Sequence, residues 1–275
     1  MTADAQRVEP SLIVTDLDGT LWHTDDLVHG DVVAALEHVL RSGPPLLVAT
    51  GRRVTSTRVP LARLGVAPAA IVLNGALGLD LATGTRFHRS PYRPAEAALV
   101  FDAFSAAGLS PCIYVDEHAF EVCVSDAPST NPGHLADLGA TAGTSDLEAV
   151  VRDVTVLGFS LIGVEHGVLV AVAEALGDVA EVHLDRSLEY PGTASLTVAP
   201  KGQSKWDGVL AFCAAQQLDP ARIVALGDGP NDLELLTGAA VALVPEHAHP
   251  AALAVADMVI PSPQRGGWAR ILDLL

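Results

Sequence analysis

Two carboxylates, Asp16 and Asp18, stand one residue apart directly after an apolar run at residues 12–14. A short apolar run of this kind is typical of a buried strand, and in an open parallel sheet ligands bind outside the carboxyl ends of the strands. Both side chains are therefore expected at the edge of a sheet, where a substrate sits. Gly19 follows them and allows the chain to turn sharply.

Three further polar groups follow predicted strands. Together with the two carboxylates, they offer what a phosphoryl transfer requires. The run Thr50-Gly51-Arg52 offers a hydroxyl and backbone amides that can hold phosphate oxygens. Lys201 offers a point charge that can neutralise a phosphate, and residues 227–232 add the carboxylates Asp228 and Asp232. Turn formation explains any one of these residues, but it does not explain four such groups on four strands.

The elements that must position these groups alternate between strands and helices in two stretches of the chain. The first stretch predicts strands at residues 12–15, 46–49 and 71–73, with helices at 32–40 and 54–64. The second predicts strands at 196–199, 223–226, 241–244 and 258–260, with helices that begin near Ser204, Asn231 and Pro250. We expect an α/β core, a Rossmann-like doubly wound parallel sheet made of residues 1–78 and 187–275.

Residues 79–186 show a different pattern and are predicted to form an inserted α+β domain. Hairpin turns are indicated at residues 83–84 and 116–118, and helices at 94–107, 145–152 and 168–176. Strands at 113–115 and 120–124 would flank the second turn. A turn over residues 116–119 would place Cys112 opposite Cys123.

Composition limits the classes of partner. The 275 residues carry 16 Lys plus Arg against 33 Asp plus Glu, a net charge of −17 that repels nucleic acid. An acidic protein that handles phosphate needs a divalent cation or a few well-placed cationic side chains. The chain lacks an apolar signal core near its start and any spanning run of about 18 apolar residues, and its three cysteines do not suggest a disulfide scaffold. We expect a cytoplasmic protein with no membrane partner.

The motifs resemble those of the haloacid dehalogenase superfamily, and within it the Cof-type sugar phosphatases with a large inserted cap. The four motifs, in order, are Asp16-Leu17-Asp18-Gly19-Thr20, Ala49-Thr50-Gly51-Arg52, Pro200-Lys201-Gly202 and Gly227-Asp228-Gly229-Pro230-Asn231-Asp232. Leu73-Asn74-Gly75 is also similar to this group. One motif alone is a weak signal, but four in order at strand ends are a strong one.

The resemblance implies roles for the acidic residues. Asp16 would be the nucleophile that forms an aspartyl-phosphate, and Asp18 the general acid and then the general base. Mg²⁺ would be held by Asp16, the backbone carbonyl of Asp18 and Asp228. Asp232 would orient a water bound to the metal.

The resemblance also implies how the substrate is held. Phosphate would contact Thr50, Gly51, Lys201 and Asn231, while Arg52 and Asn74 are candidates for contacts with the rest of the substrate. The cap would select the substrate, with residues 116–118 as candidates. Related sequences usually carry a Gly-Asn pair where this chain has Val244-Pro245-Glu246-His247, so its substrate preference is expected to differ.

The predicted function is Mg²⁺-dependent hydrolysis of a small phosphorylated metabolite, with a sugar phosphate as the favoured class. Two alternatives stay open. A phosphomutase would use the same aspartyl-phosphate but return the phosphoryl group to a sugar. A non-catalytic ligand-binding protein would keep the fold without the chemistry. Phosphate release separates the first alternative from hydrolysis, and the intact set of Asp16, Asp18, Lys201 and Asp228 argues against the second.

Overall fold

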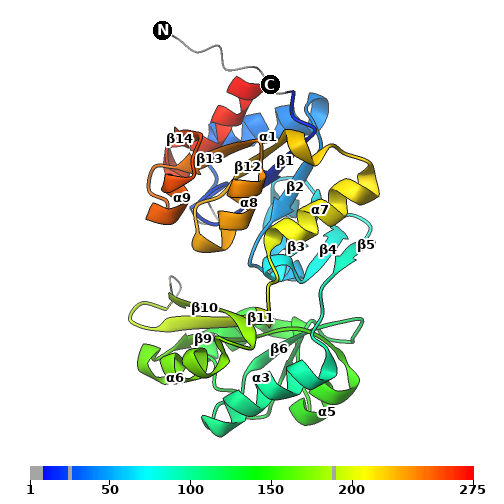
Figure 1. The fold of residues 1–275 in the computed structure, drawn as a ribbon, viewed down its shortest axis with the longest axis vertical. Helices are drawn as coiled ribbons and strands as arrows, with labels where there is room; N and C mark the ends of the chain where they lie inside the picture. Colours follow the sequence, from blue (N-terminus) through cyan, green and yellow to red (C-terminus); the bar gives the residue numbers. More distant parts are fainter. Residues whose placement is uncertain (1–8, 24–26, 188–189) are drawn as a thin grey trace. The chain divides into compact units, whose positions relative to one another are not determined.

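The computed structural model describes residues 9–23, 27–187 and 190–275 (Figure 1). The chain forms two compact units. One contains the described residues up to Arg89 together with Ser204–Leu275, and the other is Ser90–Gln203. Within the described ranges, every helix is too short or too polar to cross a membrane.

The first unit is built on an eight-stranded sheet with the order β14-β13-β12-β1-β2-β3-β4-β5. Its strands are β1 (Leu12–Thr15), β2 (Leu46–Ala49), β3 (Ala69–Val72), β4 (Leu77–Asp80), β5 (Arg86–Arg89), β12 (Ile223–Leu226), β13 (Val241–Pro245) and β14 (Met258–Ile260). Neighbouring strands from β14 to β3 pair in parallel, and β4 and β5 continue the sheet as antiparallel strands. The strand order reverses direction at β1, so the carboxyl end of β1 lies at the topological switch point where ligands bind.

Helices and short 3₁₀ turns connect these strands. They are α1 (Gly30–Ser42), α2 (Val54–Arg63), α7 (Lys205–Gln216), α8 (Leu233–Gly238), α9 (Pro250–Ala254), η1 (Leu73–Gly75), η3 (Pro220–Arg222), η4 (Pro230–Asp232), η5 (Pro263–Arg265) and η6 (Gly267–Leu274). All four residues of β1 are buried, as expected for a parallel strand covered on both faces. The parallel sheet and its helices confirm the predicted fold class.

Helix α7 packs closely on the sheet because of one glycine. A Cβ atom at Gly208 would lie 2.7 Å from the side chain of Ile71 in β3, so only glycine permits this approach. The helix begins with a capping box, in which Ser204 and Asp207 bond each other's backbone amides. Together the glycine and the cap fix the first turn of α7 over the sheet.

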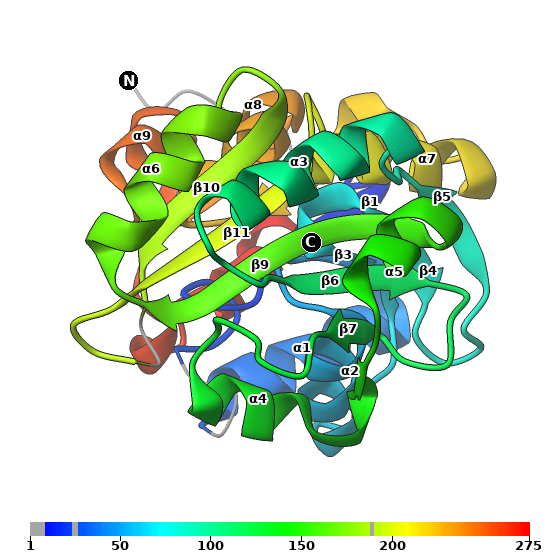
Figure 2. The same ribbon diagram turned by 90° about the horizontal axis from the view of Figure 1, so that it is seen from below.

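The second unit contains a six-stranded sheet with the order β10-β11-β9-β6-β7-β8. Its strands are β6 (Cys112–Asp116), β7 (Val122–Val124), β8 (Ala142–Thr144), β9 (Thr155–Val164), β10 (Ala180–Arg186) and β11 (Ala194–Pro200). Its helices are α3 (Pro94–Ala106), α4 (Pro132–Leu138), η2 (Gly139–Thr141), α5 (Leu147–Asp153) and α6 (His166–Leu176). Helices α3, α5 and α6 lie on one face of this sheet (Figures 1 and 2).

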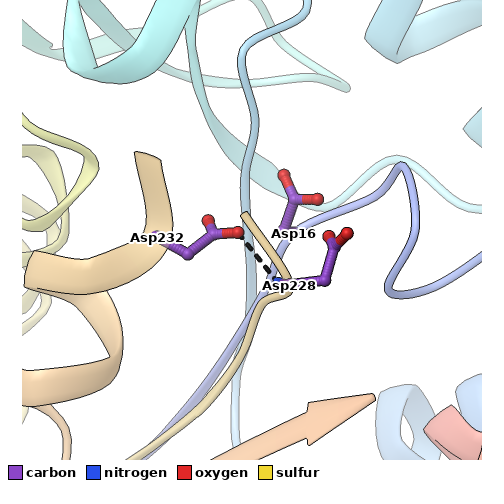
Figure 3. A group of neighbouring side chains, drawn as sticks. All are labelled: Asp16, Asp228 and Asp232. Atoms are coloured by element: carbon purple, nitrogen blue, oxygen red, sulfur yellow. Dashed lines mark hydrogen bonds between the residues drawn. The ribbon is translucent and has the colours of Figure 1, made fainter. Parts of the chain in front are cut away.

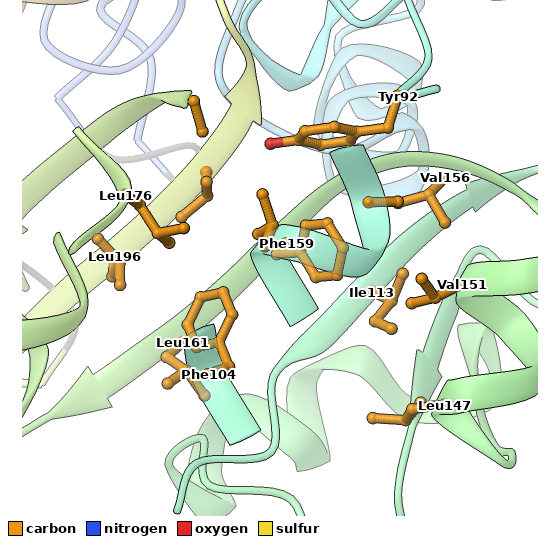
Figure 4. Packing of buried hydrophobic residues seen from close by; sticks show 14 of the residues in the cluster. Tyr92, Phe104, Ile113, Leu147, Val151, Val156, Phe159, Leu161, Leu176 and Leu196 are labelled. Atoms are coloured by element: carbon orange, nitrogen blue, oxygen red, sulfur yellow. The ribbon is translucent and has the colours of Figure 1, made fainter. Parts of the chain in front are cut away.

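An aromatic group forms the centre of the second unit's core. The ring of Phe159 in β9 lies 5.5 Å from that of Tyr92 and 6.1 Å from that of Phe104 in α3 (Figure 4). All three side chains are buried, together with aliphatic residues of β6, β11 and α6. The inserted segment therefore has a hydrophobic core of its own, as a separate domain requires.

Two predictions about the domain boundaries were wrong. Strands β4 and β5, which lie beyond the predicted boundary at residue 78, belong to the core sheet, and their hairpin turn is the one predicted at residues 83–84. Strand β11, predicted as a core strand, pairs instead with β9 and β10 in the second unit. The inserted unit is therefore Ser90–Gln203 rather than 79–186.

The predicted register between β6 and β7 was also wrong, by one residue. Ile113 lies opposite Cys123, because the connection contains one residue more than predicted and Glu117 adopts a positive φ of 55°. A shift of one residue moves a side chain to the other face of a sheet. Cys112 and Cys123 therefore point to opposite faces. Both are free and buried, as is Cys213 in α7.

Candidate active site

Asp16 and Asp228 meet at the carboxyl edge of the core sheet. Asp16 follows β1 and is 6% exposed. Gly19 has a φ of +81°, and a Cβ atom there would lie 2.3 Å from Asp228 Oδ2. The hydroxyl of Thr20 donates a hydrogen bond of 3.0 Å to Asp228 Oδ1. Glycine at position 19 thus lets the first motif close against the fourth, which confirms that these motifs share one edge of the sheet.

Asp232 completes an acidic cluster with these two residues. Carboxylate oxygens of Asp16, Asp228 and Asp232 lie within 4.8 Å of one another (Figure 3). Asp232 Oδ2 accepts hydrogen bonds of 3.0 Å from the backbone amides of Asp228 and Gly229. Its own position in η4 is therefore fixed by the loop that carries Asp228.

Lys205, at the first residue of α7, is the cation of this cluster. Its Nζ donates to Asp16 Oδ1 at 2.8 Å and to Asp232 Oδ1 at 2.7 Å. The side chain is 1% exposed, so the ammonium is held entirely inside the site. The capping box at the start of α7 and the close packing of Gly208 bring the lysine there.

The prediction that Lys201 supplies this charge was wrong. Lys201 belongs to the second unit, and its exposed ammonium donates to the carbonyl of Gly177 at 2.8 Å. The error came from assigning β11 to the core sheet, which put the residue after β11 at the wrong edge. The chain has only two lysines, and the capping box before Lys205 marks the start of α7 but not the contact of this lysine with Asp16.

The cluster contains more carboxyl groups than cationic groups. Burial raises the pKa of Asp16 well above its ordinary value, although Lys205 opposes the shift. Burial and the charge of Asp232 raise the pKa of Asp228 to about 6. Burial disfavours the charged form of Lys205, but Asp16 and Asp232 outweigh it and raise its pKa. Three carboxylates around one ammonium form a set of hard oxygen donors with a charge deficit, which suits a divalent cation such as Mg²⁺.

The loop after β2 forms the second part of the edge. Thr50 is buried, and its amide donates to the carbonyl of Ile71 at 2.9 Å. Its Oγ1 accepts from the amide of Arg52 at 3.1 Å, so the hydroxyl hydrogen stays available for an acceptor. A Cβ atom at Gly51 would lie 3.0 Å from Asn74 Oδ1. Glycine therefore lets the loop pack against Asn74.

Asn74 connects this loop to the fourth motif. Leu73 and Asn74 both have a φ of 52°. This left-handed conformation is unfavourable for a bulky residue such as leucine. Their amides donate to the carbonyls of Arg52 and Thr50 at 2.9 and 3.1 Å. Asn74 Oδ1 accepts from Asn231 Nδ2 at 3.0 Å. Asn74, a predicted substrate contact, thus holds two loops together.

Asp18 is held by Arg52 and Trp22. Arg52 donates from Nε to Asp18 Oδ2 and from Nη2 to Asp18 Oδ1, each at 2.6 Å. The indole of Trp22 donates to Asp18 Oδ1 at 3.0 Å. Sequence reasoning assigned Arg52 to the substrate and missed Trp22, whose position after the first motif gave no signal of a polar role.

The chain just after the segment that departs from the related sequences contacts the loop of the fourth motif. The amide of His249 donates to the carbonyl of Asp228 at 2.9 Å, and Glu246 pairs with Arg265. Burial lowers the pKa of His247, and the nearby His23 lowers it further. His249, two residues beyond the segment 244–247, therefore contacts the loop that carries Asp228, and the position of the segment itself beside the site stays a prediction.

An acidic cluster with a buried lysine, at the switch point of a doubly wound sheet, defines an α/β enzyme site. Residues 13–272 match the family of haloacid dehalogenase-like hydrolases. The chain belongs to this family, which confirms the resemblance drawn from its motifs.

The curated relatives and the solved structures match this chain over nearly its whole length. The chain is 24% identical over 266 residues to a phosphoglycolate phosphatase of Methanopyrus kandleri, covering 96% of this chain and 97% of the relative. A crystal structure from Thermotoga maritima superposes with a TM-score of 0.80 at 19% identity, covering 97% of each chain. A sugar phosphatase of subclass IIB superposes with a TM-score of 0.75 at 20% identity, covering 96% of this chain and 98% of the other. These structures share the fold of the present chain.

Proposed function

We propose that this protein is a Mg²⁺-dependent phosphomonoester hydrolase that acts on a small phosphorylated metabolite. The observation that carries the proposal is the buried contact of Lys205 with Asp16 inside the acidic cluster. It provides a nucleophile, a fixed positive charge and oxygen ligands for a cation in one place. The phosphatase named among the relatives, matched over 96% of this chain, supports the same class of reaction.

In the first step, an oxygen of Asp16 attacks the phosphorus of the ester. Lys205 bonds Oδ1, so we assign the attack to Oδ2. The new bond from Asp16 oxygen to phosphorus forms as the ester bond breaks, and the leaving oxygen takes a proton from Asp18. The products of this step are the free alcohol and an aspartyl-phosphate on Asp16.

In the second step, Asp18 takes a proton from a water molecule as that water attacks the phosphorus. The bond from phosphorus to Asp16 breaks, and inorganic phosphate leaves. Asp18 is again protonated and Asp16 is again a carboxylate, so the cycle closes. Splitting one displacement into two allows the same carboxyl group to serve as acid and then as base.

The residues present fit Mg²⁺, with Asp16, Asp228 and the carbonyl of Asp18 as proposed ligands. When bound, the ion supplies positive charge that offsets the repulsion between a phosphate dianion and the clustered carboxylates. Both oxygens of Asp232 already accept hydrogen bonds, from Lys205 and from two backbone amides. This supports an indirect role for Asp232, in which it orients a water beside the ion.

Phosphate binding is proposed for Thr50, Gly51, Lys205 and Asn231. Lys205 replaces the predicted Lys201. The available hydroxyl hydrogen of Thr50 and the side chain of Asn231, which Asn74 holds, are suited to phosphate oxygens. A sugar phosphate is the proposed substrate class, supported by the shared fold with a subclass IIB sugar phosphatase.

A screen of sugar phosphates, polyol phosphates and nucleotides, with and without Mg²⁺, tests the proposal. We expect Mg²⁺-dependent release of inorganic phosphate from at least one sugar phosphate, and none from an Asp16→Asn control. A product in which phosphate has moved to another hydroxyl of the sugar would instead indicate a mutase. Failure of every ester, with equal behaviour of the Asp16→Asn protein, would contradict the proposed activity.

A further inference from the structure

We propose that Trp22 is a positioning residue that holds Asp18 for proton transfer, with Asp18 Oδ2 as the oxygen that exchanges the proton. This inference rests on the proposed function and extends it. It names a residue outside the motifs and assigns one of two carboxylate oxygens.

A tight turn holds Trp22 in place. The carbonyl of Leu17 accepts the amides of Leu21 and Trp22, at 2.9 and 3.1 Å, and the amide of Gly19 donates to the carbonyl of Trp22 at 2.8 Å. The Trp22 side chain is buried, at 1% exposure for the residue. A large buried ring on a fixed backbone has little freedom to move, so its N–H points in one direction.

Asp18 has no comparable support of its own. Its side chain is 42% exposed, and its carboxylate depends on neighbouring donors for orientation. Among the described residues, three donor atoms reach it: Nε of Arg52 on Oδ2, and both Nη2 of Arg52 and the indole of Trp22 on Oδ1. Acid–base catalysis requires hydrogen-bond reach between the carboxyl group and the reacting oxygen, and a misplacement of about 1 Å costs roughly a hundredfold in rate.

Arg52 and Trp22 differ in how easily a bound substrate can draw them away from Asp18. Arg52 reaches Asp18 from another loop, and its guanidinium also donates to the carbonyl of Ser56 at 3.0 Å. Guanidinium groups bind phosphate in the same two-pronged way as carboxylate, so an incoming phosphate competes with Asp18 for Arg52. The indole N–H is a single neutral donor on a buried ring, so it cannot pair with phosphate through two donors as a guanidinium does. When Arg52 turns to the substrate, Oδ1 stays on Trp22 and Oδ2 is released toward the ester oxygen.

Trp22 also supports Arg52. The guanidinium carbon of Arg52 lies 5.5 Å from the centre of the Trp22 ring, a distance at which a cation is attracted to the ring face. The ring face and the indole N–H therefore serve different partners. A phenylalanine at this position would keep an aromatic face for Arg52 and delete only the donor to Asp18.

The test compares Trp22→Phe with wild type on two aryl phosphates that differ in leaving group. p-Nitrophenyl phosphate releases a stable phenolate that needs little help from an acid, whereas phenyl phosphate releases a more basic one. We expect kcat/KM for phenyl phosphate to fall about tenfold, as for one lost hydrogen bond to a charged group. For p-nitrophenyl phosphate we expect about a twofold fall. In an Asp18→Asn background, Trp22→Phe should not change the ratio further.

Trp206→Phe is the matched control, since its indole makes no hydrogen bond to any residue that the structure describes and its ring packs against Gly238. It should leave both values unchanged. Equal losses on both substrates, or none, in a folded Trp22→Phe protein would overturn the inference. Should that variant not fold, Trp22→Tyr deletes the same N–H and is judged by the same ratio. If wild type releases phosphate from neither aryl ester nor from any ester of the metabolite screen, and matches Asp16→Asn throughout, the proposed function fails instead.

Discussion

Lys205 Nζ lies 2.8 Å from Asp16 Oδ1 across a sequence separation of 189 residues. The pair joins the first core strand to the helix that follows the inserted unit. Both groups are buried, so removing Lys205 leaves the Asp16 carboxylate in a site of low dielectric without the cation that it contacts, whereas removing Asp16 leaves Lys205 bonded to Asp232.

Replacing Lys205 with methionine should therefore damage both stability and activity. Loss of one partner of a buried ion pair costs about 3–5 kcal/mol in the free energy of unfolding. Phosphatase activity should fall by at least about a hundredfold, because the carboxylate of Asp16 loses the positive charge that is held beside it. Lys201→Met is the matched control, with a change within about 0.5 kcal/mol and normal turnover. For each variant, urea unfolding measures the free energy of unfolding and phosphate release measures the activity. Inactivation by Lys201→Met alone would reverse the assignment.

Asp16→Asn should abolish turnover without loss of fold, because an amide is nearly isosteric with the carboxylate but is a poor nucleophile. Asp18→Asn should retain slow turnover, lowered by roughly 10²–10⁴-fold. Rapid-quench assays would show the difference, since only proteins with Asp16 can form an aspartyl-phosphate. Turnover at the wild-type rate by purified Asp16→Asn protein would contradict the covalent mechanism.

The metal-free protein should lose stability as the pH rises through about 6. The pKa of Asp228 is raised from 3.8 to about 6 in the folded protein, so the folded state binds more protons than the unfolded state between these values. The favourable contribution is complete below the unfolded pKa and is lost as the pH passes the folded pKa. Asp228→Asn should remove this loss and stabilise the metal-free protein by about 3 kcal/mol at pH 7.5.

The same variant should lose its response to Mg²⁺. At pH 7.5 the ion should raise the melting temperature of wild type but not that of Asp228→Asn. At pH 5 the effect on wild type should shrink, because protons compete with the ion for Asp228. Thermal melts with Mg²⁺ and with a chelator measure these shifts. An equal Mg²⁺ effect on both proteins would place the ion elsewhere.

Asn74→Gly should separate backbone strain from side-chain function. Glycine adopts the observed φ of 52° without strain, so the variant should be at least as stable as wild type. It also loses the acceptor for Asn231, so we expect KM for a phosphate ester to rise about tenfold. Asn231→Ala should produce a similar rise, and the double variant should add little. Additive effects would show that the two side chains act independently.

Much of the core could be predicted because its strands are buried on both faces. Strands β1, β2, β12 and β14 were predicted with the bounds found in the structure, since each is a short apolar run. Strand β11 contains a similar run, but Ser195 and Thr197 alternate with Leu196 and Val198. That alternation is typical of an antiparallel strand, and it was the signal for the second sheet.

The acidic residues and Thr50 could be located because motifs at strand ends keep their places at the edge of a sheet. Trp22 and Lys205 could not be identified as site residues from the sequence, since their roles depend on distances across loops. A lysine on the first turn of a helix and a tryptophan after a turn are ordinary in sequence. Only the close packing of α7 and the tight turn after β1 bring these side chains to Asp16 and Asp18.

The three buried thiols make the two units separately visible to a reagent that alkylates cysteine. Burial raises the pKa of Cys112 to about 12 and also raises those of Cys123 and Cys213. Thiolate is the reactive form, so the folded protein should resist alkylation. Cys112 and Cys123 lie in the inserted unit and Cys213 in the core unit. Pulsed labelling read out peptide by peptide would thus report which unit opens first, without a single engineered probe.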